Sequence, residues 1–357
     1  MSSALKKYAF INAKVRARIS KMLPDELLDE MIQAKSFLES IEHLKGTPYD
    51  TIYAVYSETG DLLTAEKELL KKEIALYLEL LNYVDKKTVG FIRALALRYE
   101  INNLKNCIRL FFDRFIRERD ISSQTPYLIY DNIIHPMNCD RIIYAGSPDE
   151  LIEGLSGTPY YDIVKSNILR LDKTLTVFPI ETALDRFYYD NVIQQISSCL
   201  SRKDKEIALR VVYLDIDLDN IGKMIRFKQF YDMDVETAQS HITPYGLVPR
   251  EPDAFKQMYE NEDISDILSA LMSKSDKSLK SFFQSDMRER NAKLLFIEKI
   301  TEQILLYNAQ KILSGPPFNI GIILAYFILK KNEIKKIMTI LNAKNYNYQP
   351  QRISELL

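Results

Sequence analysis

FIRALALRYEINNLKNCIRLFF, residues 91–112, is the stretch that decides the fold of this 357-residue chain. Its apolar residues recur at every third or fourth position, the spacing that places one stripe along an α-helix and buries it. The stripe consists of Ala94, Leu97, Ile101, Leu104, Ile108 and Phe111. The pattern predicts one core helix, or two helices end to end.

The same pattern recurs roughly 117 residues later, in EIALRVVYLDIDLDNIGKMIRFKQF, residues 206–230. Asn220 there takes the place of Asn103, and Arg226 that of Arg109. A third copy, GIILAYFILKKNEIKKIMTIL, residues 321–341, has Lys331 as the one polar member of its stripe. The predicted core of the repeats is Leu97, Ile101, Leu104, Ile108, Leu214, Leu218, Ile221, Ile225, Phe327, Ile334 and Met338.

A second repeated element supports the repeat interpretation over a chance alignment of amphipathic helices. The residues Gly46–Tyr49, GTPY, return unchanged as Gly157–Tyr160, and a degraded counterpart reads Ser273–Asp276. Glycine tolerates the left-handed backbone of a helix cap, and proline biases the residue before it away from helix. The sequence therefore predicts three similar helical modules, residues 1–120, 121–237 and 238–357, with an excursion at 121–146.

Further helices are predicted along the chain in order. The first runs from Leu5 to Leu23, the second carries apolar residues from Pro24 to Ile41, and the third runs from Thr64 to Val84. Ser147, Pro148 and Glu150 form a helix start signal. Long helices follow at 178–200 and 286–313, and short extended pieces are expected within the excursion, at 127–130 and 141–144.

Composition favours an all-α class and excludes several kinds of protein. Ten Gly and 13 Pro are few for a sheet-rich fold, and 48 basic against 49 acidic side chains give no field that would mark a nucleic-acid binder. Three cysteines without metal spacing fit a reducing compartment. No secretory signal peptide is expected, and the longest apolar run, 320–329, is about half of what a bilayer crossing requires.

No catalytic, cofactor-binding or metal-binding residue is predicted. DIDLDN, residues 215–220, resembles the start of a calcium loop, but the sixth position lacks Gly and the twelfth lacks Glu, so these acids are interpreted as a solvated face or a helix cap. The histidines His43, His135 and His241 have no second ligand at metal spacing. No glycine-rich phosphate motif is present. Tyrosines such as Tyr49 and Tyr160 are expected in the core.

Stretches from the N-terminal, central and C-terminal parts of the chain together resemble the C subunit of the V-type and archaeal-type ATPases, which is related to the vacuolar d subunit. The opening YAFINAKVRAR places Tyr8, Lys14, Arg16 and Arg18 on that family's first signature. LRYEINNLKNCIR and ALDRFYYDNV resemble its Glu/Asp-x-x-Asn-Leu-Lys and Leu-Asp-x-x-Tyr-Tyr signatures. PPFNIGIILAYFILKKNEIKKI, residues 316–337, resembles its Ala-Tyr-x-x-x-Lys-x-x-Glu-x-x-x-Ile ending.

The resemblance implies a funnel of three helical modules with pseudo-three-fold symmetry. Such a subunit is seated on the membrane rotor ring of proteolipid subunits and receives the coiled coil of the central stalk. It couples ATP hydrolysis or synthesis to transport of protons or sodium ions, as a non-catalytic peripheral subunit on the cytoplasmic face, monomeric when isolated. A helical scaffold or adaptor of unrelated function is the alternative, and an all-α enzyme would need an acid or metal cluster that the repeats do not keep.

Overall fold

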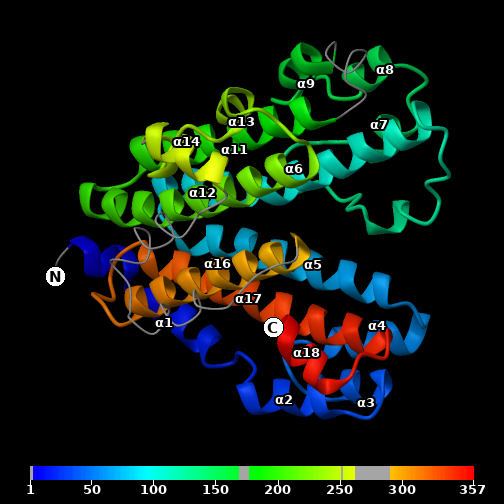
Figure 1. Cartoon of the computed structure of the whole chain (residues 1–357). Helices are drawn as coiled ribbons and strands as arrows, with labels where there is room; N and C mark the ends of the chain where they lie inside the picture. The colour runs from blue at the N-terminus through cyan, green and yellow to red at the C-terminus, as the bar shows by residue number, and fades with distance from the viewer. Residues whose placement is uncertain (1–2, 169–176, 251, 262–289) are drawn as a thin grey trace. The chain divides into compact units, whose positions relative to one another are not determined.

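The computed structural model describes residues 3–168, 177–250, 252–261 and 290–357 (Figure 1). In these ranges every regular element is a helix, which confirms the all-α prediction. The chain divides into two compact units. We call residues 41–200 the central unit, and residues 1–40 together with 201–357 the split unit.

The central unit is built around α6 and α11, which pack against each other. Helix α5 lies against α4 and α6, and α7 packs on α6. The helices are α4 (Asp50–Thr59), α5 (Leu62–Leu80), α6 (Lys86–Phe115), α7 (Cys139–Ile143), α8 (Pro148–Glu153), α9 (Tyr161–Ile168) and α11 (Phe178–Cys199), with 3-10 turns η1 (Leu81–Tyr83) and η2 (Thr125–Tyr127).

The split unit joins the N-terminal helices to the C-terminal half of the chain. Helix α17 is its centre, with α16, α1, α12, α2 and α18 packed around it. The helices are α1 (Ser3–Ile19), α2 (Asp25–Gln33), α12 (Arg202–Phe230), α13 (Val235–His241), α14 (Pro252–Asn261), α16 (Arg290–Leu313), α17 (Gly321–Asn345) and α18 (Pro350–Leu356), with the 3-10 turn η3 (Val248–Arg250). Helix α3 (Phe37–Glu42) contains the boundary between residues 40 and 41.

Each of the three similar stretches forms one continuous helix. Helix α6 has 30 residues, α12 has 29 and α17 has 25, and Asp85 and Ser201 cap the first two through their side chains. Eight of the predicted core residues are buried: Leu97, Ile101, Leu104, Ile108, Leu218, Ile221, Phe327 and Ile334. Leu214, Ile225 and Met338 are partly exposed.

The two GTPY turns have the same local structure. Gly46 and Gly157 have φ of +70° and +79°, and Thr47 and Thr158 each donate from Oγ1 to the carbonyl three residues earlier. Tyr49 and Tyr160 are buried, as expected. The degraded counterpart, 273–276, lies outside the described residues.

Two expected elements differ from the structure. The helix predicted from Pro24 to Ile41 is split into α2 and α3, because Ser36 caps a new helix. Its Oγ accepts from Glu39 N, and Glu39 Oε2 accepts from Lys35 N just before the cap. The extended piece predicted at 141–144 is wrong, since Asn138 caps the helix α7 by accepting from Arg141 N. The start signal at Ser147 is confirmed, with Ser147 Oγ accepting from Glu150 N.

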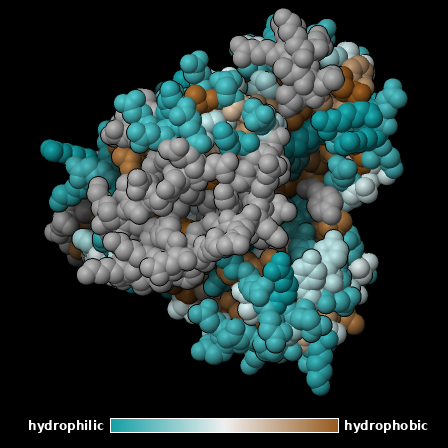
Figure 2. Space-filling view, viewed as in Figure 1, coloured by the Kyte–Doolittle hydropathy of each residue, from teal (hydrophilic) through white to brown (hydrophobic). Residues whose placement is uncertain are grey.

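On the face drawn in Figure 2 the described residues are mostly hydrophilic, with hydrophobic residues singly or in small groups. No helix in the described ranges combines the length and apolarity that a bilayer crossing requires.

Candidate functional site

The residues with the most distinctive contacts are polar side chains that α6 and α12 bury against the segments following them. In the central unit, Asn103 is 5% exposed. Its Nδ2 donates to the carbonyl oxygen of Ile129 at 2.8 Å, and its Oδ1 accepts from Ile129 N at 2.9 Å. Because only an amide side chain offers a donor and an acceptor in this arrangement, Asn103 satisfies both backbone groups of Ile129.

One helical turn before Asn103, the buried carboxylate of Glu100 holds the same segment further along. Its Oε2 accepts from the backbone N–H groups of Ile134 and His135 at 2.6 and 2.8 Å. Its Oε1 lies 2.7 Å from His135 Nδ1 and accepts from the Tyr160 hydroxyl at 2.6 Å. Burial and the Glu100 charge raise the pKa of Tyr160, so its hydroxyl remains a donor.

Helix α12 repeats this arrangement in the split unit. Asn220 donates to the carbonyl of Thr243 at 2.9 Å and accepts from Thr243 N at 2.8 Å. Asp217 accepts from Leu247 N and Val248 N at 2.7 and 2.9 Å. We call the pairs Glu100/Asn103 and Asp217/Asn220 the acid–asparagine clamps, each of which fastens the segment that follows its helix.

A glycine makes the second clamp possible. Gly246 has φ of +93°, and a Cβ atom there would lie far inside van der Waals contact with Asp217 Oδ1. No side chain larger than hydrogen fits in that space, so the close approach of the backbone to the carboxylate depends on Gly246.

The corresponding positions of α17 hold Lys330 and Glu333. Glu333 is 5% exposed and accepts from Leu23 N at 2.6 Å, while its other oxygen lies 3.0 Å from Lys330 Nζ. Leu23 precedes α2, so this helix too holds a segment that leads into another helix. A carboxylate cannot donate to a carbonyl, so Glu333 cannot reproduce the two-way bond of the asparagines.

Two of the sequence signatures meet in the central unit. Lys105 Nζ on α6 forms an ion pair with Asp185 on α11. Arg98, also on α6, donates to the Tyr189 hydroxyl at 3.0 Å and lies over the ring of Tyr188. Polar residues of both signatures thus join these two helices.

The interpretation of the DIDLDN acids as a solvated face or a helix cap is wrong for Asp217. Residues 215–220 lie inside α12, where Asp217 is 3% exposed and bound to backbone N–H groups. Asp219 pairs with Lys223 one turn later at 2.8 Å. Among the described residues, no group of three His, Cys, Asp or Glu side chains is placed to hold a metal ion.

Two of the three cysteines lie together in the central unit. Cys107 and Cys139 are buried next to each other, and Cys139 Sγ contacts Asn103 and the Ile129 carbonyl. The hydrogen bond with Cys139 and burial raise the pKa of the Cys107 thiol, which favours its protonated form.

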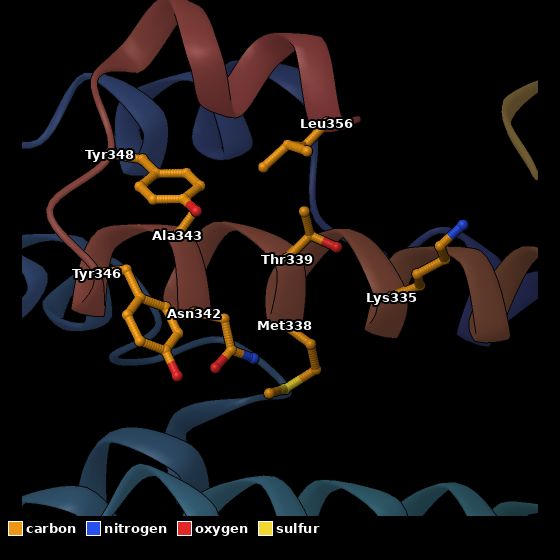
Figure 3. A pocket seen from close by; sticks show the side chains of 8 residues that line it. All are labelled: Lys335, Met338, Thr339, Asn342, Ala343, Tyr346, Tyr348 and Leu356. Carbon is orange, nitrogen blue, oxygen red and sulfur yellow. The ribbon is translucent and has the colours of Figure 1, made fainter. Parts of the chain in front are cut away.

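A hollow of about 360 Å³ is lined by residues of α17, of α18 and of the link between them (Figure 3). Thr339, Tyr348 and Leu356 face the space between these helices, while Met338 projects from the other side of α17. Lys335 at its edge pairs with Glu302 at 2.6 Å. The lining is completed by Asn342, Ala343 and Tyr346. It contains no acid, histidine or cysteine with which to perform catalysis.

The sequence pattern shows that Asn103 is repeated as Asn220, but it does not show that the acids before them bind the backbone. The feature that could have indicated this role is an acid three residues before the asparagine in both copies. It is obscured because the three acids of DIDLDN resemble a single motif.

Comparison with known proteins gives a consistent result over almost the whole chain. The family described as ATP synthase (C/AC39) subunit matches residues 11–356. The A-type ATP synthase C subunit of Methanocaldococcus jannaschii is 24% identical over 351 residues, which cover 98% of this chain and 86% of the relative. The proteins of the same name from Methanothermobacter thermautotrophicus and Thermococcus gammatolerans are 25% and 22% identical, covering 94% and 98% of this chain and 84% and 89% of theirs.

Proposed function

Because the chain belongs to the ATP synthase (C/AC39) subunit family, whose members are accessory and not catalytic subunits, we propose that it is the central-stalk socket of a rotary V/A-type ATPase. It seats on the membrane rotor ring, receives the stalk coiled coil, and passes torque between ATP hydrolysis or synthesis and ion transport. It acts on the cytoplasmic face, as a peripheral subunit without cofactor or substrate of its own.

The observation that carries this proposal is the repeated clamp. A socket that transmits torque has to resist deformation, and in a chain of separate modules the connecting segments deform most easily. The acid–asparagine clamps fix two connecting segments to the preceding helix through buried hydrogen bonds, which are more costly to break than exposed ones. Glu333 and Leu23 supply a third such junction.

The same observation supports the modular arrangement. If residues 1–120, 121–237 and 238–357 are three modules, each junction joins the core helix of one module to the first helices of another. The α17 junction then joins the last module to the first, which is what a closed pseudo-three-fold funnel requires. A linear scaffold or adaptor would have no need of a contact between its last and first modules.

The two partner contacts should differ in chemistry. Three modules cannot each bind one protomer in the same way if the rotor ring has a different number of identical subunits. We therefore expect the contact with the rotor ring to consist of many small polar contacts. Surface ion pairs are weak and screened by salt. A coiled coil entering a helical cavity buries apolar side chains, a contribution that salt does not screen.

The test is to purify the tagged chain from its own membranes and to measure what remains bound across a salt series. The proposal predicts that stalk subunits and proteolipids co-purify, and that salt releases the ring before the stalk. Co-purification of unrelated proteins alone would favour the scaffold alternative. Equal salt dependence of both contacts would show that the ring surface is apolar.

A further inference from the structure

Helix α1 and the turn after it have an unusual charge pattern. They carry six basic side chains and no acidic one, since the first acid of the chain is Asp25. Exposed faces of other helices pair opposite charges four residues apart, as Arg117 does with Asp113 and Arg202 with Glu206. Helix α1 contains no acid with which to form such pairs within itself, so its own side chains contribute only positive charge.

Four exposed residues of α1 share one side of the helix, and an exposed lysine stands in the turn after it. Phe10 is 64% exposed, and Lys6, Ala13, Ala17 and Lys21 are exposed as well. The spacing of three and four residues places Lys6, Phe10, Ala13 and Ala17 in one row of the helix. We call this row, together with Lys21 in the turn that follows it, the outer face of α1.

The opposite side of α1 is fixed to the split unit. Tyr8, Ile11 and Val15 are buried, and the Tyr8 hydroxyl donates to Asp204 on α12 at 2.8 Å. The packing of α1 against α17 adds to this anchor. The outer face is therefore held outward by a well-packed inner face, and Phe10 is exposed as a consequence of the register.

We propose that the outer face of α1 docks on an anionic lipid surface. Phe10 enters the interfacial region, and Lys6 and Lys21 at the two ends of the outer face pair with headgroup phosphates. An aromatic residue flanked by cations is the pattern of helices that lie in the membrane interface, and each basic residue near an anionic leaflet adds to binding.

A protein partner fits the outer face less well. A stable protein interface buries about 800 Å² on each side around a cluster of large apolar or aromatic side chains. The outer face offers one large apolar side chain and two alanines. Lipid binding needs no shape complementarity, and it goes beyond the proposed function because it is separate from the contacts with ring protomers and stalk.

The first experiment is sedimentation of the full chain with vesicles of phosphatidylcholine, with and without phosphatidylglycerol. Binding is expected only to the anionic vesicles and should weaken with salt. The double variant Lys6→Glu/Lys21→Glu should lower the partition coefficient by about tenfold or more. Lys86→Glu/Lys87→Glu, the same charge change at exposed positions of α6, is the matched control and should bind nearly as the parent chain does.

The second experiment uses the absence of tryptophan from the chain. Phe10→Trp introduces the sole indole, whose emission should shift to shorter wavelength with anionic vesicles and stay unchanged with neutral ones. No shift, or equal loss of binding in the control variant, would overturn the proposal. If Lys6→Glu/Lys21→Glu loses binding to the isolated rotor ring while its vesicle binding is unchanged, the outer face is instead a protein contact. Vesicles contain no ATPase subunit, so these results are independent of the proposed function.

Discussion

The clamp on α12 repeats the clamp on α6 group for group, whereas the same two positions of α17 carry different chemistry. In both clamps an asparagine binds the N–H and the carbonyl of one residue, and an acid one turn earlier accepts two backbone N–H groups. On α17 the pair is Lys330 and Glu333, and the acid now stands in the asparagine position, where it accepts from Leu23 N.

The difference follows from what each junction connects. The segments after α6 and α12 continue the same chain directly, so a clamp can form on a nearby loop. Leu23 is 310 residues from Glu333, so the α17 junction joins chain segments that have to find each other across the whole sequence. Bringing Leu23 and Glu333 together carries a larger entropic cost of loop closure than fastening a nearby loop. The side chains at the two kinds of junction need not be alike.

The largest loss of stability is expected at a buried core position of each clamped helix. Leu104→Asp on α6 and Ile221→Asp on α12 each place an unpaired charge at a position with 0% exposure. Each should cost roughly 3–5 kcal/mol of unfolding free energy. Thermal or denaturant melts measure this, with Leu104→Ala and Ile221→Ala to separate the charge from the cavity. A variant that melts like the parent chain would remove that position from the predicted core.

The second-largest loss of stability is expected when the asparagine of a clamp is removed. Asn103→Ala or Asn220→Ala removes the side chain that binds both backbone groups of Ile129 or Thr243, so that the N–H loses its acceptor. The two carbonyls keep only their bonds from Cys139 Sγ and Tyr245 N, and the loss should be roughly 2–4 kcal/mol in total. Asn102→Ala is the matched control, since Asn102 is the exposed neighbour on the same helix, and it should change stability by less than about 0.5 kcal/mol. Similar losses in Asn103→Ala and Asn102→Ala would mean that the clamp adds nothing to the fold.

A glycine substitution separates backbone strain from clamp chemistry. Gly246→Ala and Gly157→Ala both place a Cβ atom on a residue with positive φ, which costs about 1–2 kcal/mol. At Gly157 nothing lies within 4 Å of the new atom, whereas at Gly246 it meets Asp217. Gly246→Ala should therefore lose roughly 1–3 kcal/mol more than Gly157→Ala in the same melts. Equal losses would show that Asp217 moves aside without cost.

These contrasts also show what the sequence could and could not predict. The helical class, the three core helices and the repeated GTPY turns follow from local patterns, because period and capping are properties of neighbouring residues. The roles of Glu100 and Asp217 depend on backbone groups roughly 30 residues away, which no local pattern contains. The split of the helix predicted at Pro24–Ile41 was readable in Ser36 and Glu39, but a continuous apolar pattern concealed it.

The smallest loss of unfolding free energy is expected for a substitution of Glu333 on α17. Glu333→Gln keeps an oxygen that can accept from Leu23 N but loses the charge facing Lys330, so we expect a loss of about 0.5–1.5 kcal/mol. Its local signature should be clearer than its effect on the melt, because amide exchange reports opening at a single residue. Leu23 N is held by one carboxylate oxygen, while Ile129 and Thr243 are each held at both backbone groups. The Leu23 amide should therefore exchange faster than those of Ile129 and Thr243, and Glu333→Gln should accelerate it without changing the other two. If Leu23 exchanges as slowly as they do, or if Glu333→Gln costs as much as Asn103→Ala, then the acid on α17 fastens its junction as firmly as a clamp. The chemical difference between the junctions would then have no mechanical consequence.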